Sequence, residues 1–176
     1  MASTTTTSAT SPTTTTLSPG STTSTVPASS NAGGPKGCTA ASLKVARGGS
    51  QGAAGTIYTG FTISDKTSVP CTLDGYPAVS LVPHSGTLHP TFSHSGFKPP
   101  SSIVVGPGGA GAAFVLRYSD VQENGQTSCP QIDAIKARMP GTAPAQLVPF
   151  RIYPCGAPSI GISAVVSAAS YRAEFS

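Results

Sequence analysis

The sequence is short of charge, has no tryptophan and contains no long apolar run. Only 9% of its 176 residues are charged, against about 25% in an average globular protein. Glycine and proline are abundant instead, at 20 and 17 residues, and both disfavour helix interiors, so the composition argues against a helical bundle. No apolar stretch approaches the length of a membrane-crossing helix, and we therefore expect no transmembrane segment.

Residues 1–34 differ in composition from the rest of the chain. Serine and threonine make up most of this segment, prolines are interspersed, and none of its residues is charged. Only Leu17 and Val26 could enter a core, which is too little to offset the entropy cost of ordering the segment. We therefore predict a disordered linker or stalk over 1–34, of a composition often O-glycosylated in secreted proteins. One folded domain should follow over 35–170, with a short C-terminal tail over 171–176.

The cysteines indicate the compartment. None of Cys38, Cys71, Cys129 and Cys155 belongs to a pair with metal-ligand spacing, so two disulfides explain them better than a zinc site. Disulfides form in oxidising compartments. The first residues carry neither a basic segment nor an apolar one, so we expect no signal peptide within them. We infer from the cysteines that the protein is exported, to the cell envelope or the extracellular space.

Four cysteines allow three pairings. Cys38 and Cys71 flank the first predicted hairpin, and Cys129 and Cys155 flank the last. Crossed pairings would close longer loops, which the chain-entropy model favours by only roughly 0.8 kcal/mol each. Because the ends of a hairpin lie close together, we expect the bonds Cys38–Cys71 and Cys129–Cys155.

Apolar and polar residues alternate along most of the predicted domain. The clearest examples are 57–63 and 110–118, and such alternation is typical of half-buried strands. Turn residues separate nearly all of these segments. Further strands are expected at 43–45, 79–83, 103–105 and 160–166. The sequence therefore predicts an all-β fold, an antiparallel β-sandwich of immunoglobulin-like architecture with two disulfides.

The segment 131–139 fits two structures. Ile132, Ile135 and Met139 have a helical spacing, but the segment could also be a strand that forms a hairpin with 146–150. The length of the segment favours the strand.

Several motifs resemble the DUF4232 family, a family of domains of unknown function. The most specific is the run Cys71-Thr72-Leu73-Asp74-Gly75-Tyr76-Pro77, in which Gly75 fits a tight turn. Cys38 precedes this run, and Cys129, Met139-Pro140 and Pro154-Cys155 follow it in the family's order. The resemblance covers about residues 37–167.

The resemblance implies an exported or lipid-anchored envelope protein of actinobacteria, with a β-sandwich and two disulfides. Members of this family often carry a Ser/Thr-rich tether after a lipid-modified cysteine. Residues 1–34 resemble that tether, so the resemblance implies a lipid anchor upstream of this sequence.

The three histidines are the only candidates for a metal site. His84, His89 and His94 fall within one segment, 84–100, and imidazoles gathered in this way could bind copper or zinc. Their regular spacing of five residues places neighbours on opposite faces of a strand. An exposed polar loop is the simpler interpretation of 84–100. We expect no cofactor.

Catalytic and nucleic-acid-binding patterns are weak. A hydrolase needs a base oriented by a buried carboxylate, whereas Asp65, Asp74, Asp120 and Asp133 stand in turn or loop contexts. The basic residues are scattered, and only Lys136 and Arg138 are near neighbours, so we expect a small positive patch and no nucleic-acid partner.

We therefore predict a non-enzymatic surface module that is displayed on a flexible stalk. Its loops, such as 84–100 and 119–128, would bind an envelope component or a protein. The alternative is a periplasmic metal-handling or hydrolytic protein that uses His84, His89 and His94.

Overall fold

The protein is seen in a computed structural model that describes residues 34–96, 98–123, 125–156 and 158–175. The predicted stalk, apart from Gly34, lies outside the described residues. The strands are β1 Leu43–Ala53, β2 Thr56–Asp65, β3 Cys71–Leu73, β4 Ala78–Pro83, β5 Thr91–His94, β6 Ile103–Val105, β7 Ala110–Ser119, β8 Ile132–Arg138, β9 Gln146–Ile152, β10 Ser159–Ile162 and β11 Val166–Ser167. A helix, α1 (Ala168–Phe175), follows β11. The prediction of an all-β fold is confirmed.

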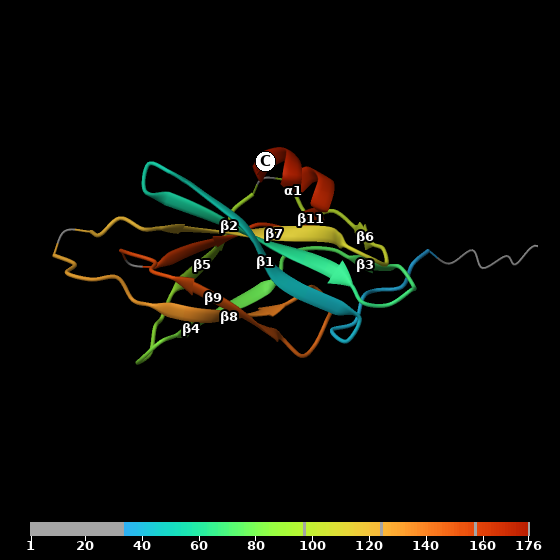
Figure 1. Ribbon diagram of the computed structural model, residues 1–176, viewed down its shortest axis with the longest axis horizontal. Coiled ribbons are helices and arrows are strands. Elements are labelled where there is room, and N and C mark those ends of the chain that lie inside the picture. The colour runs from blue at the N-terminus through green and yellow to red at the C-terminus, as the bar shows by residue number, and fades with distance from the viewer. Residues whose placement is uncertain (1–33, 97, 124, 157, 176) are drawn as a thin grey trace, which may run out of the picture. The chain divides into compact units, whose positions relative to one another are not determined.

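Two sheets face each other. The larger has the strand order β1-β2-β7-β10-β5, with β11 also paired to β7, and the smaller has the order β4-β8-β9. A separate pair, β3 and β6, completes the strands of the described residues. Figure 1 shows α1 on one side of β7 and the β4-β8-β9 sheet on the other.

The core lies between the two sheets. Phe61 of β2 is paired with Phe114 of β7, and their rings stack with centroids 5.1 Å apart. The ring of Phe150, from β9 of the smaller sheet, meets Phe61 edge-on at 5.1 Å. Aromatic pairs of this kind add about 0.5–1.5 kcal/mol each beyond their burial. This cluster of three rings therefore joins the two sheets.

The alternation predicted for 110–118 is confirmed. Ala112, Phe114 and Leu116 point into the core between the sheets. Ala113 and Val115 point to the opposite face of β7, where they form a second apolar cluster with residues of α1 and β11. Because successive side chains of a strand alternate between its faces, β7 contributes to two buried layers.

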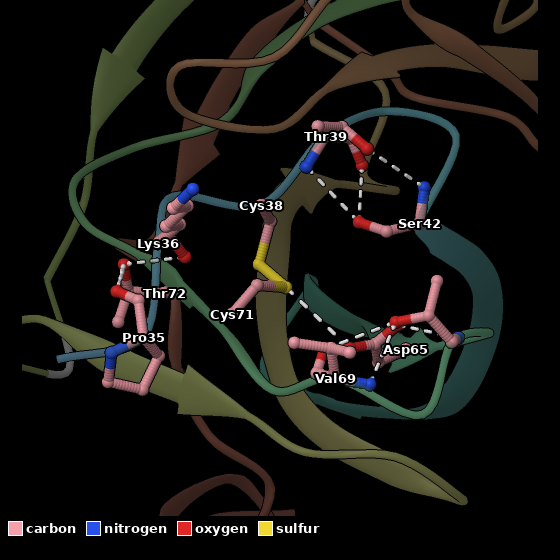
Figure 2. The surroundings of a disulfide bond; sticks show 10 residues. Pro35, Lys36, Cys38, Thr39, Ser42, Asp65, Val69, Cys71 and Thr72 are labelled. Carbon is pink, nitrogen blue, oxygen red and sulfur yellow. Dashed lines mark hydrogen bonds between the residues drawn. A yellow bond between two sulfur atoms is a disulfide. The ribbon is translucent and has the colours of Figure 1, made fainter. Parts of the chain in front are cut away.

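Both predicted disulfides are present. Cys38 is bonded to Cys71 and Cys129 to Cys155, each with Cα atoms 4.8 Å apart. Figure 2 shows the first bond, which ties the segment before β1 to the start of β3. Beside it, Oδ1 of buried Asp65 accepts hydrogen bonds of 2.7 and 2.8 Å from the backbone N–H and hydroxyl of Thr67. Asp65 therefore orders the turn that leads to Cys71.

The ambiguous segment 131–139 is a strand. Its residues Ile132–Arg138 form β8, which pairs with β9 (Gln146–Ile152) as the predicted hairpin. A bulge between Ile132 and Ala134 shifts the register. The bulge explains why the apolar spacing of this segment deviated from a period of two.

The segment 84–100 contains a strand that the sequence did not predict. β5 pairs with β10 in parallel, with Phe92 opposite Ile160. This pair is a departure from a purely antiparallel sandwich. All four residues of β5 are exposed, so no alternation of burial marks the strand, and its partner is remote in the sequence. β5 is the last strand in the order of the larger sheet and so forms one of its edges.

The strand expected over 160–166 is interrupted. Ile162 is paired with Leu116, whereas Val166 is paired with Ala113, so one extra residue lies on the β10–β11 side. Buried Ser163 occupies this bulge, and its hydroxyl accepts a 2.9 Å hydrogen bond from the backbone N–H of Val115. A side-chain oxygen thus replaces a backbone partner of the sheet, which splits the predicted strand into β10 and β11.

The end of the chain also differs from the expected tail over 171–176. The hydroxyl of Ser167 caps α1 by accepting a 3.1 Å hydrogen bond from the backbone N–H of Ser170. Tyr171 is buried against the outer face of the sheet, where Gly60 leaves room for its ring: a Cβ at Gly60 would collide with it. The described residues contain no helix long and apolar enough to cross a membrane.

The stability of the fold should depend on β7 far more than on the outer face of β9. Leu116 is fully buried, whereas Leu147 is 62% exposed. We predict that Leu116→Ala lowers the free energy of unfolding by about 2–5 kcal/mol, because it leaves a cavity between the sheets. The matched variant Leu147→Ala should cost less than about 1 kcal/mol. Urea denaturation measures both, and equal losses would contradict this assignment of the core.

Candidate functional site: a basic groove beside β8

The structure separates the candidate histidines by their contacts. Nδ1 of His84 lies 2.7 Å from Oδ2 of Asp133. The ring of His94 stacks on Tyr76, with centroids 3.8 Å apart and planes 5° from parallel. His89 is exposed just before β5. Within the described part of the chain, no group of three or more histidine, cysteine or acidic residues is placed to hold a metal ion.

Asp133 is the centre of a polar network. It lies in β8, not in a turn as the sequence suggested. Its Oδ1 accepts a 2.7 Å hydrogen bond from Nε2 of Gln131 and lies 3.7 Å from Nε of Arg151. The hydrogen bonds from Gln131 and His84, with the positive charge of Arg151, hold the pKa of Asp133 below its usual value. The network is open to solvent, since the side chains of His84 and Asp133 are 62% and 38% exposed.

The sequence contains one serine pattern that is typical of hydrolases. Gly48-Gly49-Ser50-Gln51-Gly52 has the Gly-x-Ser-x-Gly spacing of a hydrolase nucleophile. The structure places this run inside β1, not at a turn from a strand to a helix. The hydroxyl of Ser50 forms a 2.8 Å hydrogen bond with that of Thr59. The pattern is therefore part of a sheet and does not form the strained turn that activates such a serine.

A hollow surface lies at one end of the smaller sheet. Two hollows of about 420 and 320 Å³ adjoin there and share Ala78 and Arg138. We call them together the basic groove. Its lining residues are Tyr76, Ala78, Val79, Ser80, Lys136, Arg138, Met139, Pro140, Gly141, Thr142, Ala143, Pro144 and Ala145.

The strand pairing places small side chains opposite the two cations of the groove. In the β4–β8 ladder, Ala78 is opposite Arg138 and Ser80 is opposite Lys136. Both cations point away from the core, because the apolar residues between and beside them, Ala137 among them, face inward. Small residues on β4 thus leave the aliphatic stems and charged ends of the cations uncovered.

The connection between β8 and β9 forms one wall of the basic groove. The backbone N–H and the hydroxyl of Thr142 both donate to the carbonyl of Met139, at 3.0 and 2.9 Å. Gly141 adopts a positive φ of 69° in this turn, a conformation that favours glycine. The Ala143–Pro144 peptide bond is cis. The two hydrogen bonds of Thr142 and the turn at Gly141 fix the path of the wall beside Arg138.

The cations of the groove are free to meet a ligand. Lys136 and Arg138 are exposed, and neither forms an ion pair with an acidic residue of the described chain. Among the described residues, no acidic one lines the groove. The sequence predicted a small positive patch at these two residues, and the structure adds the walls around it. Such a surface attracts carboxylate, phosphate or sulfate groups.

The predicted binding loops contribute unequally to the basic groove. The segment 84–100 reaches its rim through His94, which stacks on the lining residue Tyr76. None of the lining residues comes from 119–128. The 139–145 wall could not be predicted from the sequence, because the segment shows only a turn at Met139-Pro140-Gly141 and a second proline, Pro144.

The charge network of Asp133 makes a testable prediction. The pKa of its carboxyl is lowered in the folded protein, so the network stabilises the fold above the ordinary carboxyl pKa and loses this effect as the pH falls through the lowered value. Carbon-13 NMR titration should find the midpoint of Asp133 below the usual range. The midpoint should rise in Gln131→Leu and in His84→Ala, because each variant removes a hydrogen bond to the carboxylate. A wild-type midpoint at or above the usual value would refute the network.

Comparison with known proteins gives a family. A family model described as "Domain of unknown function (DUF4232)" matches residues 38–168. The match begins at the first cysteine of the first disulfide and ends at the start of α1, so it spans both sheets. No curated protein and no solved structure matches the chain. With most of its length matched, including all four disulfide cysteines, the chain belongs to the DUF4232 family.

Proposed function

We propose that this protein is a non-enzymatic binding module of the cell envelope or cell surface, and that its basic groove holds a segment of an acidic envelope polymer. Residues 1–34 would act as the flexible stalk that displays it. The observation that carries the proposal is the groove itself, which is lined by Lys136 and Arg138 and by no acidic residue.

Export is supported by the cysteines. All four are paired in two disulfides, and none is free. Such bonds persist in oxidising compartments and are rare in reducing ones. Membership of the DUF4232 family adds the expectation of an actinobacterial envelope protein, with a lipid anchor upstream of the stalk. We extend the proposal to that location and that anchor.

The spacing of the cations favours an extended ligand. Lys136 and Arg138 are two residues apart on one strand, so their stems start roughly 7 Å apart. A polymer with an acidic group on successive units could meet both at once. The groove runs along both cations, from Tyr76 at the Arg138 end to Ser80, which is opposite Lys136. A single small anion would leave most of this surface unused.

The alternative remains a metal-handling or hydrolytic protein that uses the histidine segment. The 2.7 Å contact between His84 and Asp133 favours it, because a carboxylate that orients an imidazole is one part of a catalytic triad. His94 stacks on Tyr76 and so does not join His84. The basic groove therefore supports the binding function better.

Binding to a carboxylate-bearing glycan tests the proposed function. The full chain should bind oligomers of polygalacturonate in isothermal titration calorimetry and should not bind neutral maltooligosaccharides of equal length. The variant Lys136→Glu/Arg138→Glu should weaken binding by about tenfold or more, since it replaces attraction by repulsion at both contacts. Affinity should also fall with added salt.

A matched control variant distinguishes binding in the groove from a general effect of the protein's net charge. Lys44→Glu/Lys66→Glu changes the formal charge by the same amount at two exposed lysines outside the groove, and should weaken binding by less than about threefold. Equal losses in the two variants would show that only net charge matters. Absence of binding by the wild-type protein would overturn the proposed function, and equal binding of poly-glutamate would indicate an acidic peptide instead of a glycan.

A further inference from the structure

A second hollow lies on the other sheet and is independent of the basic groove. It measures about 180 Å³ and is lined by Thr56, Ser93, Arg117, Tyr118, Ser119, Ser159 and Gly161. We infer that this Arg117 hollow is a binding site for a single anionic group, a phosphate, sulfate or carboxylate carried by a small hydroxylated molecule. None of its lining residues lines the basic groove.

Four strands build the Arg117 hollow on the outer face of the larger sheet. Arg117 of β7 is paired on one side with Tyr58 of β2 and on the other with Gly161 of β10. Gly161 is paired in turn with Ser93 of β5. Neighbours of these residues along the strands, such as Tyr118 and Ile162, belong to the inner core. Arg117 and Ser93 therefore point outward.

A glycine keeps the floor of the hollow open. A Cβ at Gly161 would lie 2.5 Å from Oγ of Ser95 and 3.3 Å from Cβ of Arg117. The first distance is a collision, and any larger side chain would push into the hollow. Gly161 is itself buried. The absence of a side chain here lets Arg117 approach Ser93 of β5, and Ser95 just after it, across β10.

The lining groups suit an anion with hydroxyls around it. Arg117 is exposed, has no ion pair with an acidic residue of the described chain, and carries a planar guanidinium that binds oxyanions with two parallel hydrogen bonds. Thr56, Ser93 and Ser159 add hydroxyls. The hydroxyl oxygen of Ser119 accepts a 3.2 Å hydrogen bond from the backbone N–H of Val121, which leaves its own hydrogen to donate.

The charge and size of the hollow restrict the class of ligand that it could bind. No carboxylate of the described chain lines it, and burial raises the pKa of the Tyr118 phenol. Arg117 is therefore the one charged group among its described lining residues. Drug-sized ligands occupy pockets of about 300–1,000 Å³. The hollow is smaller, so it suits one anionic group with its adjoining hydroxyls and not a whole polymer segment. This distinguishes its ligand from that of the basic groove.

NMR titration of the full chain tests the Arg117 hollow. Sodium phosphate, sodium sulfate and sodium acetate are added separately at constant ionic strength, with sodium chloride as the reference. At least one of them should shift the Nε–H signal of Arg117 and the amide of Gly161 with saturation in the millimolar range. The three salts also distinguish the kinds of anion.

Variants make the test specific. Arg117→Gln should weaken binding by about tenfold or more, because it removes the charge that meets the anion. Ser93→Ala should weaken it by about threefold, the effect of one hydrogen bond. Arg151→Gln, at an exposed arginine of the other sheet, should have no effect, and neither should Lys136→Glu/Arg138→Glu. Shifts no larger than those with chloride, or an unchanged affinity in Arg117→Gln, would overturn the inference.

Discussion

The pairing of β2 with β7 is the constraint on which the other elements depend. It sets Phe61 against Phe114 in the core, and Phe150 of the smaller sheet packs on that pair. The same register turns the alternate residues of β7 outward, where Tyr171 of α1 covers one part of the face and Arg117 stands in the other. A shift of one residue in the pairing of β2 with β7 would exchange the two faces of β7. The core, the surface that α1 covers and the Arg117 hollow would then be lost together.

The scarcity of acidic residues connects the fold to its proposed binding surfaces. The whole sequence has six acidic residues and ten basic ones. One of the acidic residues, Asp133, already interacts with His84 and Arg151. Arg117 and Arg138 remain without an acidic partner in the described residues and stand beside hollows. Each is held on a strand whose other face is buried, so its backbone is fixed before a ligand arrives. Rigid placement of this kind lowers the entropy cost of binding.

Local signals predicted much of this structure, and contacts between remote segments account for what they missed. The alternation along 110–118 correctly predicted which residues of β7 lie on each face. The expectation that the ends of a hairpin lie close together correctly predicted both disulfides. β5 has no alternation of burial and takes its order from β10, far away in the sequence. The bulge at Ser163 depends on a hydroxyl that pairs with Val115. The basic groove needs β4 beside β8, whereas the sequence indicated only the two neighbouring cations, Lys136 and Arg138.

Native-state hydrogen exchange tests the central role of the β2–β7 pairing most directly. The backbone amides of Phe61 and Phe114 should exchange only through global unfolding, so their free energies of opening should equal the free energy of unfolding from urea denaturation. Amides of the edge strand β5, such as that of Thr91, which donates to the carbonyl of Pro158, should open at lower free energy. Slower exchange in β5 than at Phe61 and Phe114 would contradict the account.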